Sequence, residues 1–336
     1  MVGPIIDRLV LLLPPLGFKP DVFSAVAIDV ADLAKAKKAE ELELAKVLEA
    51  DATEGVSLLF PGLTVTMAKA GSGARKGYKA AFHIRAGAGE KGDPTLTLQV
   101  GPTGSKALGY SCRADWNPAR FTQSENARIF EGLFQCASAQ NVAAPMLLPQ
   151  IRVTRVDAAF DLPEQGFSTF AFAHRKKQVI QGEGRRLAGL TGIRFGAEGD
   201  SHVVVYDRLK LPHNPSPALR IEFRIMPKGG DQPLLALPHL VSPLDDLLVM
   251  DTAALPLTKA HRRHLATAVN VAGLREALGD LSLDDSPIAA DLLLGSTPPW
   301  WAPGDLWGGW PASAHALLAV AACGLPLPPV LAGSVV

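Results

Sequence analysis

Cysteine and tyrosine are scarce in this sequence, and the shortage of cysteine excludes two kinds of site. Only 3 cysteines and 3 tyrosines occur among the 336 residues. Cys112, Cys136 and Cys323 are odd in number and show no CxxC spacing, which argues against a disulfide framework and a thiolate zinc site. This cysteine usage favours a protein of the reducing cytoplasm.

An excess of charge and a long apolar run are also missing. The 33 lysine and arginine residues balance 33 aspartate and glutamate residues, so total charge neither supports nor excludes a polyanionic partner. Pro14 and Pro15 interrupt the N-terminal run "LVLLLPPLGF", and His315 and three prolines interrupt the C-terminal run "ASAHALLAVAACGLPLPPVLAGSVV". Neither run offers a clean span of ~20 residues, so we expect no signal peptide and no membrane anchor.

Local charge is uneven, however. Between residues 151 and 230 there are 13 lysine and arginine residues against 8 acidic ones. Five of these basic residues cluster in sequence: Arg175, Lys176, Lys177, Arg185 and Arg186. The middle of the chain is therefore the part expected to meet a polyanion.

The order of apolar patterns predicts an α+β fold, in which antiparallel sheets carry helices packed on one side. We expect a strand-rich half over residues 1–118, a second strand–helix unit over 119–230, and a helical, Pro- and Trp-rich region over 231–336. Within this frame "VSLLF" at 56–60 is expected to be a strand, "TQSENARIFEGLFQCASAQ" a helix capped by Thr122 or Ser124, and "FSTFAFAHRKK" at 167–177 a short helix.

Two motifs that suggest chemistry have simpler interpretations. "GAGEKG" at 87–92 satisfies GxGxxG, but a strand follows it, so no helix N-terminus is available for a pyrophosphate and we expect a hairpin turn. His261 and His264 in "HRRH" have the spacing of two metal ligands on a helix. Because two arginines lie between them, a solvated basic face is the favoured interpretation.

Strand alternation gathers acids, arginines and one tyrosine. "RVTRVDAAFDL" and "ALRIEFRI" each have one apolar face and one charged face, and "HVVVYDR" has a mixed face. The polar sides of the three strands carry Arg155, Asp157, Asp161, His202, Tyr206, Arg208, Arg220, Glu222 and Arg224. If the strands share a sheet, the carboxylates can bind Mg²⁺ or Mn²⁺, and the alternative is cross-strand pairing of the acids with the arginines.

These residues also carry a family resemblance. The succession "ADWNPARF", "VTRVDAAFDLP", "TGIRFGAEGDSHVVVYDRLK" and "ALRIEFRI", with "PIIDRLVLLLP" before it, resembles the replication-initiation proteins of rolling-circle plasmids and filamentous phages, the non-HUH Rep_trans group. The resemblance covers roughly residues 5–228 in order. Each motif is short, and their order and spacing are more specific than any one of them.

The resemblance implies an enzyme that nicks and rejoins DNA. Tyr206 would be the nucleophile that forms a 5′-phosphotyrosyl link, and Asp157, Asp161 and Glu222 would bind Mg²⁺ or Mn²⁺. The implied partners are single-stranded or supercoiled origin DNA, a host helicase and a second copy of the chain. The residues expected to contact DNA are Arg155, Arg175, Lys176, Lys177, Arg185, Arg186, Arg208, Arg220 and Arg224.

Three positions depart from the family pattern. "GAEGDS" stands where the family has a basic "GSRKS", Val204 stands where it has arginine, and Arg208 replaces its usual lysine. The alternative function is therefore a catalytically silent relative that binds DNA or serves in an assembly. The two functions differ at Tyr206, because only the first needs its hydroxyl.

Overall fold

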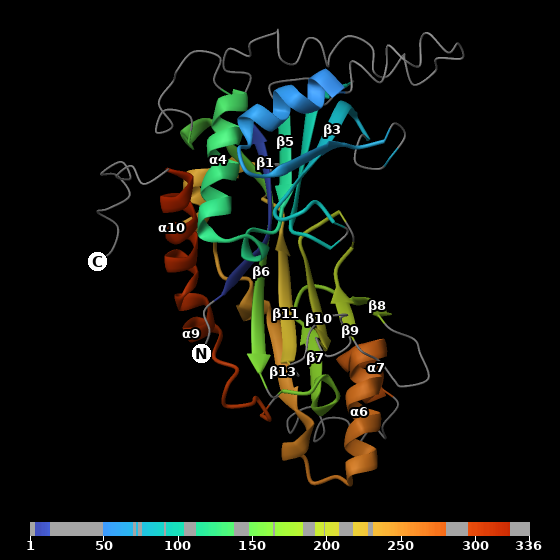
Figure 1. Cartoon of the computed structure of the whole chain (residues 1–336). Helices are drawn as coiled ribbons and strands as arrows, with labels where there is room; N and C mark the ends of the chain where they lie inside the picture. Colours follow the sequence, from blue (N-terminus) through green and yellow to red (C-terminus); the bar gives the residue numbers. More distant parts are fainter. Residues whose placement is uncertain are drawn as a thin grey trace, which may run out of the picture. The chain divides into compact units, whose positions relative to one another are not determined.

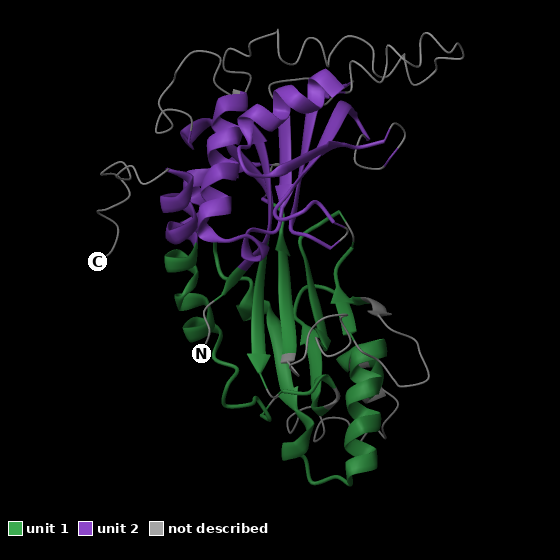
Figure 2. Cartoon of the chain, viewed as in Figure 1, with its two compact units in different colours: residues 1–5, 157–226, 239–313 green, residues 6–156, 227–238, 314–336 purple. Residues whose placement is uncertain are grey.

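The computed structural model of the chain shows strands and helices in two compact units (Figures 1 and 2). The structure describes residues 4–13, 50–69, 72, 76–90, 92–103, 112–137, 148–163, 165–183, 192–197, 199–207, 218–227, 231–279 and 295–322. Unit 1 comprises residues 1–5, 157–226 and 239–313, and unit 2 comprises residues 6–156, 227–238 and 314–336. Both units are discontinuous in sequence. Their bounds therefore do not coincide with the three consecutive segments 1–118, 119–230 and 231–336 that we expected from the sequence.

Unit 2 is built on an antiparallel meander. Its strands follow the order β2 (Thr64–Met67), β3 (Tyr78–Arg85), β4 (Thr95–Pro102), β5 (Cys112–Trp116) and β1 (Ile5–Leu13), and β6 (Arg152–Pro163) begins beside β1. Alternation sends Phe82 and Leu98 into the core, where both are fully buried. The turn between β3 and β4 contains Gly87 and Gly89 at φ 80° and 83°, which confirms a hairpin turn at "GAGEKG".

Helix α4 (Gln123–Ala137) covers the core of unit 2. Thr122 and Glu125 form a reciprocal capping box at its start: the Glu125 backbone N–H donates to Thr122 Oγ1 at 3.2 Å, and the Thr122 backbone N–H donates to Glu125 Oε2 at 2.7 Å. Phe130 packs edge-on against Trp116 of β5, with ring centroids 5.6 Å apart. The predicted helix and its Thr122 cap are therefore confirmed.

Unit 1 contains the second half of β6 and two strand systems. Beside β6 lie β11 (Ala218–Ile225), β10 (His202–Asp207), β9 (Gly192–Phe195) and β8 (Val179–Glu183), and β13 (Leu247–Asp251) pairs separately with β7 (Phe170–His174). Helices α6 (Lys259–Ala272) and α7 (Leu274–Gly279) pack against β7, and the Asn270 amide bonds the β7 backbone at Phe170 and Phe172. This amide satisfies both an N–H and a C=O of that strand.

The C-terminal part of the chain adds α9 (Pro303–Gly308) and α10 (Trp310–Ala321). In unit 1, Trp307 of α9 lies against Phe160 of β6, with ring centroids 6.2 Å apart, and Phe160 also meets Phe223 of β11 edge-on. These contacts fill the apolar side of β6 and β11. The charged residues of β6 and β11 lie on the opposite side of these strands.

The remaining elements are short. Strand β12 (Gln232–Pro233) pairs with β6 in unit 2, and residues 50–59 are helical. The 3-10 helices span Pro118–Arg120, Leu148–Gln150, Phe167–Thr169, Leu234–His239, Leu244–Asp246 and Thr252–Ala254. Cys112 and Cys136 are buried free thiols. In the described part of the chain, no helix is long and apolar enough to cross a membrane.

The predicted α+β class, with antiparallel strands and a helical C-terminal region, is confirmed. Two elements were predicted wrongly. Residues 56–59 of "VSLLF" belong to a helix, because Val56 and Phe60 are four positions apart and are both fully buried on one side. The segment predicted as a short helix at 167–177 contains β7 instead, because Phe170–His174 pairs with β13, a strand more than 70 residues further along the chain.

Candidate functional site

Three adjacent strands of unit 1 bring the predicted site residues onto one surface. Strand β11 lies between β6 and β10, and β10 pairs antiparallel with β11 so that Tyr206 is opposite Arg220, Val204 opposite Glu222, and His202 opposite Arg224. Opposite residues in such a pair share one side of the sheet. We call this side the charged face; it comprises Asp157, Asp161, His202, Tyr206, Arg220, Glu222 and Arg224.

Tyr206 is held next to a carboxylate. Its hydroxyl donates to Glu222 Oε2 at 3.3 Å, which is long for an O–H···O bond. The Tyr206 side chain is half-buried, whereas Glu222 is only 6% exposed. The sequence prediction that Tyr206 and Glu222 lie together on neighbouring strands is thus confirmed as geometry, and their chemical roles stay a prediction.

A glycine on the next strand makes room for the tyrosine. Gly192 of β9 pairs with Tyr206, and a Cβ added there would lie 2.9 Å from Tyr206 Cβ and 3.0 Å from the Val205 carbonyl oxygen. Real Cβ atoms do not approach so closely, so any larger residue would displace the tyrosine. Gly192 was not predicted from the sequence, although a glycine inside a strand pattern is a signal of close backbone approach.

Asp161 of β6 and Arg220 of β11 form a two-pronged ion pair. Arg220 Nε donates to Asp161 Oδ1 at 2.7 Å and Arg220 Nη2 donates to Oδ2 at 2.8 Å. Such parallel bonds fix the guanidinium plane as well as its position. Because Arg220 is only 7% exposed and lies opposite Tyr206, Asp161 holds a positive charge beside the tyrosine.

The other two acids share Arg224. Its Nε lies 3.1 Å from Glu222 Oε1 and 3.6 Å from Asp157 Oδ2. Asp157 is the most buried of the three acids, at 2% exposure. The charged face is therefore a network in which each acid has an arginine beside it, which agrees with the cross-strand pairing that the sequence left open as an alternative.

This arrangement does not fit a divalent cation as it stands. Mg²⁺ and Mn²⁺ prefer several carboxylate or water oxygens that converge on one point. Both oxygens of Asp161 accept from Arg220, and the two oxygens of Glu222 accept from Arg224 and Tyr206. Among the described residues, no three histidine, cysteine or acidic side chains are grouped so that they could hold a metal ion.

The predicted DNA-binding residues are distributed over several elements. Arg155 lies on β6 and Arg220 and Arg224 lie on β11, while Arg175, Lys176 and Lys177 follow β7. Arg175 and Lys176 are exposed, and Lys176 forms an ion pair with Asp246 at 2.8 Å. Arg185, Arg186 and Arg208 lie outside the described residues.

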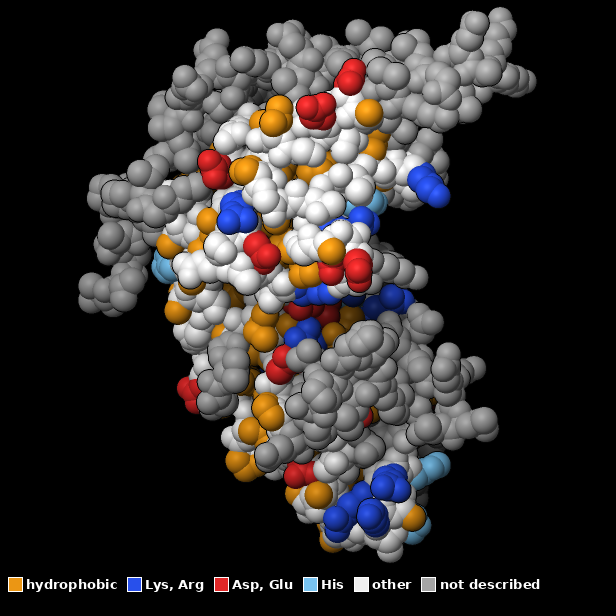
Figure 3. Space-filling view, viewed as in Figure 1, with side chains coloured by type: hydrophobic (Ala, Val, Ile, Leu, Met, Phe, Trp, Pro, Cys, Tyr) orange, Lys and Arg blue, Asp and Glu red, His pale blue; other side chains and the backbone are white. Residues whose placement is uncertain are grey.

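The helix α6 carries a further basic surface, which Figure 3 shows as a group of lysine and arginine side chains. Its N-terminal half contains Lys259, Arg262 and Arg263, and Thr258 caps its start through a bond from the His261 backbone N–H. His261 and His264 are both exposed, as expected for a solvated basic face. This surface is a second place where a polyanion can be attracted.

Unit 2 has a smaller charged cluster of its own. Arg8 donates to both oxygens of Asp115 at 2.8 Å, and Arg113 donates to Asp115 Oδ2 at 2.9 Å and to Gln99 Oε1 at 2.6 Å. Burial would raise the pKa of Asp115, but the two arginines hold that pKa below its usual value. This cluster was not predicted from the sequence.

Two comparisons with known proteins found no match. No protein-family model matches the chain, and no curated protein matches it significantly. The function must therefore be argued from the chemistry of the charged face.

Proposed function

We propose that this protein nicks and rejoins DNA through Tyr206, as an initiator of rolling-circle replication does. The observation that carries the proposal is the hydrogen bond from the Tyr206 hydroxyl to the buried Glu222 carboxylate. A tyrosine becomes a useful nucleophile when an adjacent base accepts its proton. The resemblance of the surrounding motifs to the Rep_trans initiators points to the same residue.

The reaction can be written with side chains of the charged face. Tyr206 Oη transfers its proton to Glu222 and forms a bond to the phosphorus of one phosphodiester, while the bond from phosphorus to the 3′ oxygen breaks. The leaving 3′ oxygen takes up the proton, which leaves a 3′-hydroxyl and a 5′-phosphotyrosyl ester. Rejoining is the reverse attack by a 3′-hydroxyl on that ester.

Arginine side chains supply the positive charge that such a reaction requires. Arg220 lies opposite Tyr206 in the strand register, and Arg224 contacts Glu222. Guanidinium groups bind phosphate oxygens well and stabilise charge that develops on them in the transition state. Asp161 would act as a positioning residue, because it fixes the plane of the Arg220 guanidinium.

The divalent cation implied by the resemblance stays a prediction. Asp157, Asp161 and Glu222 would have to exchange arginine contacts for a metal ion before they could bind one together. When bound, such an ion would polarise the phosphoryl oxygens.

A catalytically silent DNA-binding protein is the second candidate function. It is favoured by the pairing of every acid on the charged face with an arginine, since such pairs also occur on purely structural sheets. It needs the basic surfaces and does not need the Tyr206 hydroxyl.

Covalent capture of DNA tests the proposal. We expect the full chain, incubated with single-stranded oligonucleotides of randomised sequence in the presence of Mg²⁺ or Mn²⁺, to form an adduct that survives denaturing electrophoresis. Mass spectrometry should place the phosphotyrosyl group on Tyr206. Tyr206→Phe keeps the ring and should form no adduct, while Tyr78→Phe, a matched change on β3 of unit 2, should leave the yield unchanged.

Three results would contradict the proposal or one part of it. The absence of an adduct with any sequence in the pool would favour the silent DNA-binding protein, and an adduct on Tyr78 or Tyr110 would move the site. The same reaction in chelator tests the cation: the resemblance predicts no adduct there, and full yield in chelator contradicts the metal assignment to Asp157, Asp161 and Glu222.

A further inference from the structure

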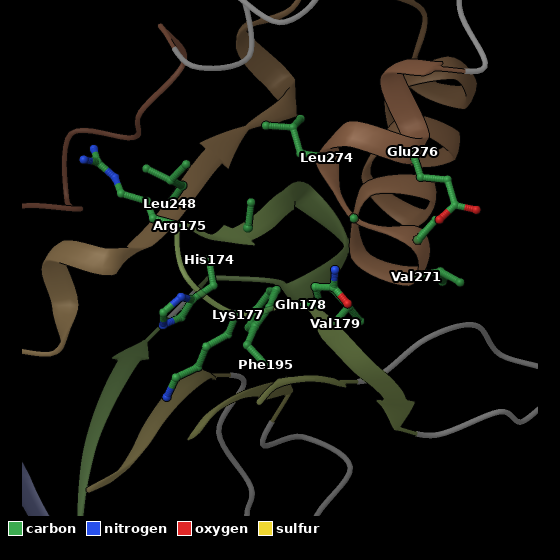
Figure 4. Close-up of a pocket in the computed structure, with 13 residues that line it drawn as sticks. His174, Arg175, Lys177, Gln178, Val179, Phe195, Leu248, Val271, Leu274 and Glu276 are labelled. Carbon is green, nitrogen blue, oxygen red and sulfur yellow. The ribbon is translucent and has the colours of Figure 1, made fainter. Parts of the chain in front are cut away.

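Unit 1 contains a cavity of about 930 Å³ that the nicking proposal does not use (Figure 4). In Figure 4 the side chains of His174, Lys177 and Phe195 come from the strand side of the cavity, and those of Val271 and Glu276 come from the helices. The cavity is lined by residues from the end of β7 to the start of β8, and by residues of β9, β13, α6 and α7: Ala173, His174, Arg175, Lys177, Gln178, Val179, Phe195, Leu248, Val271, Ala272, Gly273, Leu274 and Glu276.

One part of the lining is apolar and aromatic. The ring centroids of His174 and Phe195 lie 6.0 Å apart with the planes tilted by 39°. Leu248, Val271 and Leu274 provide aliphatic surface. A planar ring of a ligand can lie against such a lining, and the volume is within the range of small-molecule sites.

The other part of the lining is polar and contains Arg175, Lys177 and the Glu276 carboxylate of α7, so it has one more positive than negative charge. The aliphatic part of Lys177 lies close to Gly196, where φ is 99° and an added Cβ would be 3.0 Å from Lys177 Cδ. Lys177 Nζ donates to the Ser201 carbonyl oxygen. Burial lowers the pKa of Lys177, although Asp200 and Asp246 act in the opposite direction.

His174 adds a neutral ring to this polar side. Its Nδ1 accepts from the Lys176 backbone N–H at 3.1 Å, which leaves the proton on Nε2. Burial first, and then the Lys177 charge, lower the pKa of His174 to about 4. The imidazole can therefore stack as an uncharged ring and donate through Nε2 at neutral pH.

We propose that this cavity binds a nucleotide, with its base against His174 and the aliphatic lining and its phosphate on Lys177. Arg175 provides a second positive charge at the cavity, and the Gln178 amide offers both a donor and an acceptor to a base edge. The same chemistry is present in a free mononucleotide and in one unit of a single DNA strand. The proposal requires nothing of Tyr206 and does not depend on DNA nicking.

Calorimetric titration of the full chain tests the proposal. The probes are the four deoxynucleoside 5′-monophosphates, the corresponding nucleosides and inorganic phosphate. We expect a monophosphate to bind at least tenfold more tightly than its nucleoside or phosphate alone, because only the nucleotide uses both parts of the lining. Lys177→Gln should weaken monophosphate binding about tenfold or more, since it removes one charge-assisted bond.

Lys79→Gln is the matched control. Lys79 is an exposed lysine on β3 of unit 2 and does not line the cavity, so its loss should leave nucleotide affinity unchanged. Phe195 is buried, so a change there tests the fold and not the contact with a ligand. Gln178→Ala, at an exposed position on the lining, tests the contact with the base, and it should change the preference among the four bases.

Competition distinguishes the two sources of the ligand. If a single-stranded oligonucleotide displaces a bound monophosphate and binds more tightly than the monophosphate, the cavity binds one unit of a DNA strand. If it does not, the ligand is a free nucleotide. Both outcomes support the proposal. Failure of all four monophosphates to bind at millimolar concentration would overturn it, and so would equal loss of affinity in the Lys177→Gln and Lys79→Gln variants.

Discussion

At the scale of single residues, the position of Tyr206 depends on what lies beside it. Gly192 on β9 faces Tyr206 Cβ, and Glu222 on β11 accepts from its hydroxyl. Catalysis by a positioned nucleophile is sensitive to displacements of about 1 Å, which can cost roughly a hundredfold in rate. The smallest change that moves the tyrosine without removing it is therefore informative.

We predict that Gly192→Ala lowers the rate of adduct formation by roughly a hundredfold while DNA affinity is retained, because the added methyl group displaces Tyr206 from Glu222. Single-turnover kinetics and a separate binding titration measure the two quantities. Gly199→Ala is the control, because an added Cβ at Gly199 meets no atom within 4 Å. The φ of Gly199 is 100°, so this variant shows the effect of backbone strain without a steric clash. An unchanged rate in Gly192→Ala would mean that the tyrosine position is not critical.

A second prediction at this scale concerns His174 and acid stability. The pKa of His174 is about 4 in the folded protein, against 6.5 for an unperturbed histidine, because burial and the nearby Lys177 and Lys176 disfavour the imidazolium, while Asp246 favours it. Between these values the unfolded chain binds the proton and the folded chain does not. Protonation of His174 in the unfolded chain therefore lowers the free energy of unfolding as the pH falls from 6.5 towards 4. Above pH 6.5 the histidine is neutral in both states, and this loss of stability is absent.

Urea unfolding at about pH 7 and about pH 5, on either side of the unperturbed pKa, measures this loss. The wild-type chain should lose more stability between the two pH values than His174→Asn does. An equal loss in both chains would show that other groups account for the acid sensitivity.

At the scale of elements, the ion pair between β6 and β11 connects two strands of unit 1. We predict that Asp161→Ala lowers the free energy of unfolding by about 3–5 kcal/mol, because it leaves a buried guanidinium without this carboxylate. Denaturant unfolding measures the change. The exposed pair of Lys176 with Asp246 provides the comparison, and Lys176→Ala should cost no more than about 1 kcal/mol. A loss below about 1 kcal/mol in Asp161→Ala would show that solvent replaces the pairing.

The elements also show what the sequence can predict and what it cannot. Strict alternation predicted the charged face, because each polar residue of β11 has an apolar neighbour on both sides along the strand. Short apolar runs were ambiguous: residues 56–59 are helical, although a run of this kind also suits a buried strand. Strand β7 has four consecutive buried residues, so it shows no alternation, and its partner β13 is distant in sequence.

The same limit applies to the site. The sequence identified Asp157, Tyr206 and Glu222 from alternation and from the resemblance. It could not choose between a metal site and arginine pairing, because that choice depends on which oxygen each guanidinium reaches. It missed the cavity for a related reason, since β7, α6 and α7 meet there through contacts between residues far apart in the chain.

At the scale of the whole molecule, the chain has no net charge, so the DNA binding that we propose would depend on local basic surfaces. Arg175, Lys176 and Lys177 follow β7, and α6 carries a separate group with Lys259, Arg262 and Arg263. Each phosphate contact that a lysine or arginine makes with a single strand contributes about 0.7 to the slope of log affinity against log salt concentration. The change in this slope when one surface is altered therefore gives the number of phosphate contacts made there. The measurement does not require the recognised DNA sequence to be known.

We predict that changing Arg175, Lys176, Lys177, Arg185 and Arg186 together to Ala reduces that slope for single-stranded DNA by roughly 2–3.5, as expected for three to five lost contacts. Fluorescence anisotropy over a series of salt concentrations measures it. A triple change of Lys259, Arg262 and Arg263 to Ala is the matched control, because it removes exposed or part-exposed positive charge from α6. If only the α6 variant flattens the slope, DNA binds at α6 and the five residues are ordinary solvated surface. If neither does, the phosphate contacts lie elsewhere, and the arginines of the charged face are the next set to change.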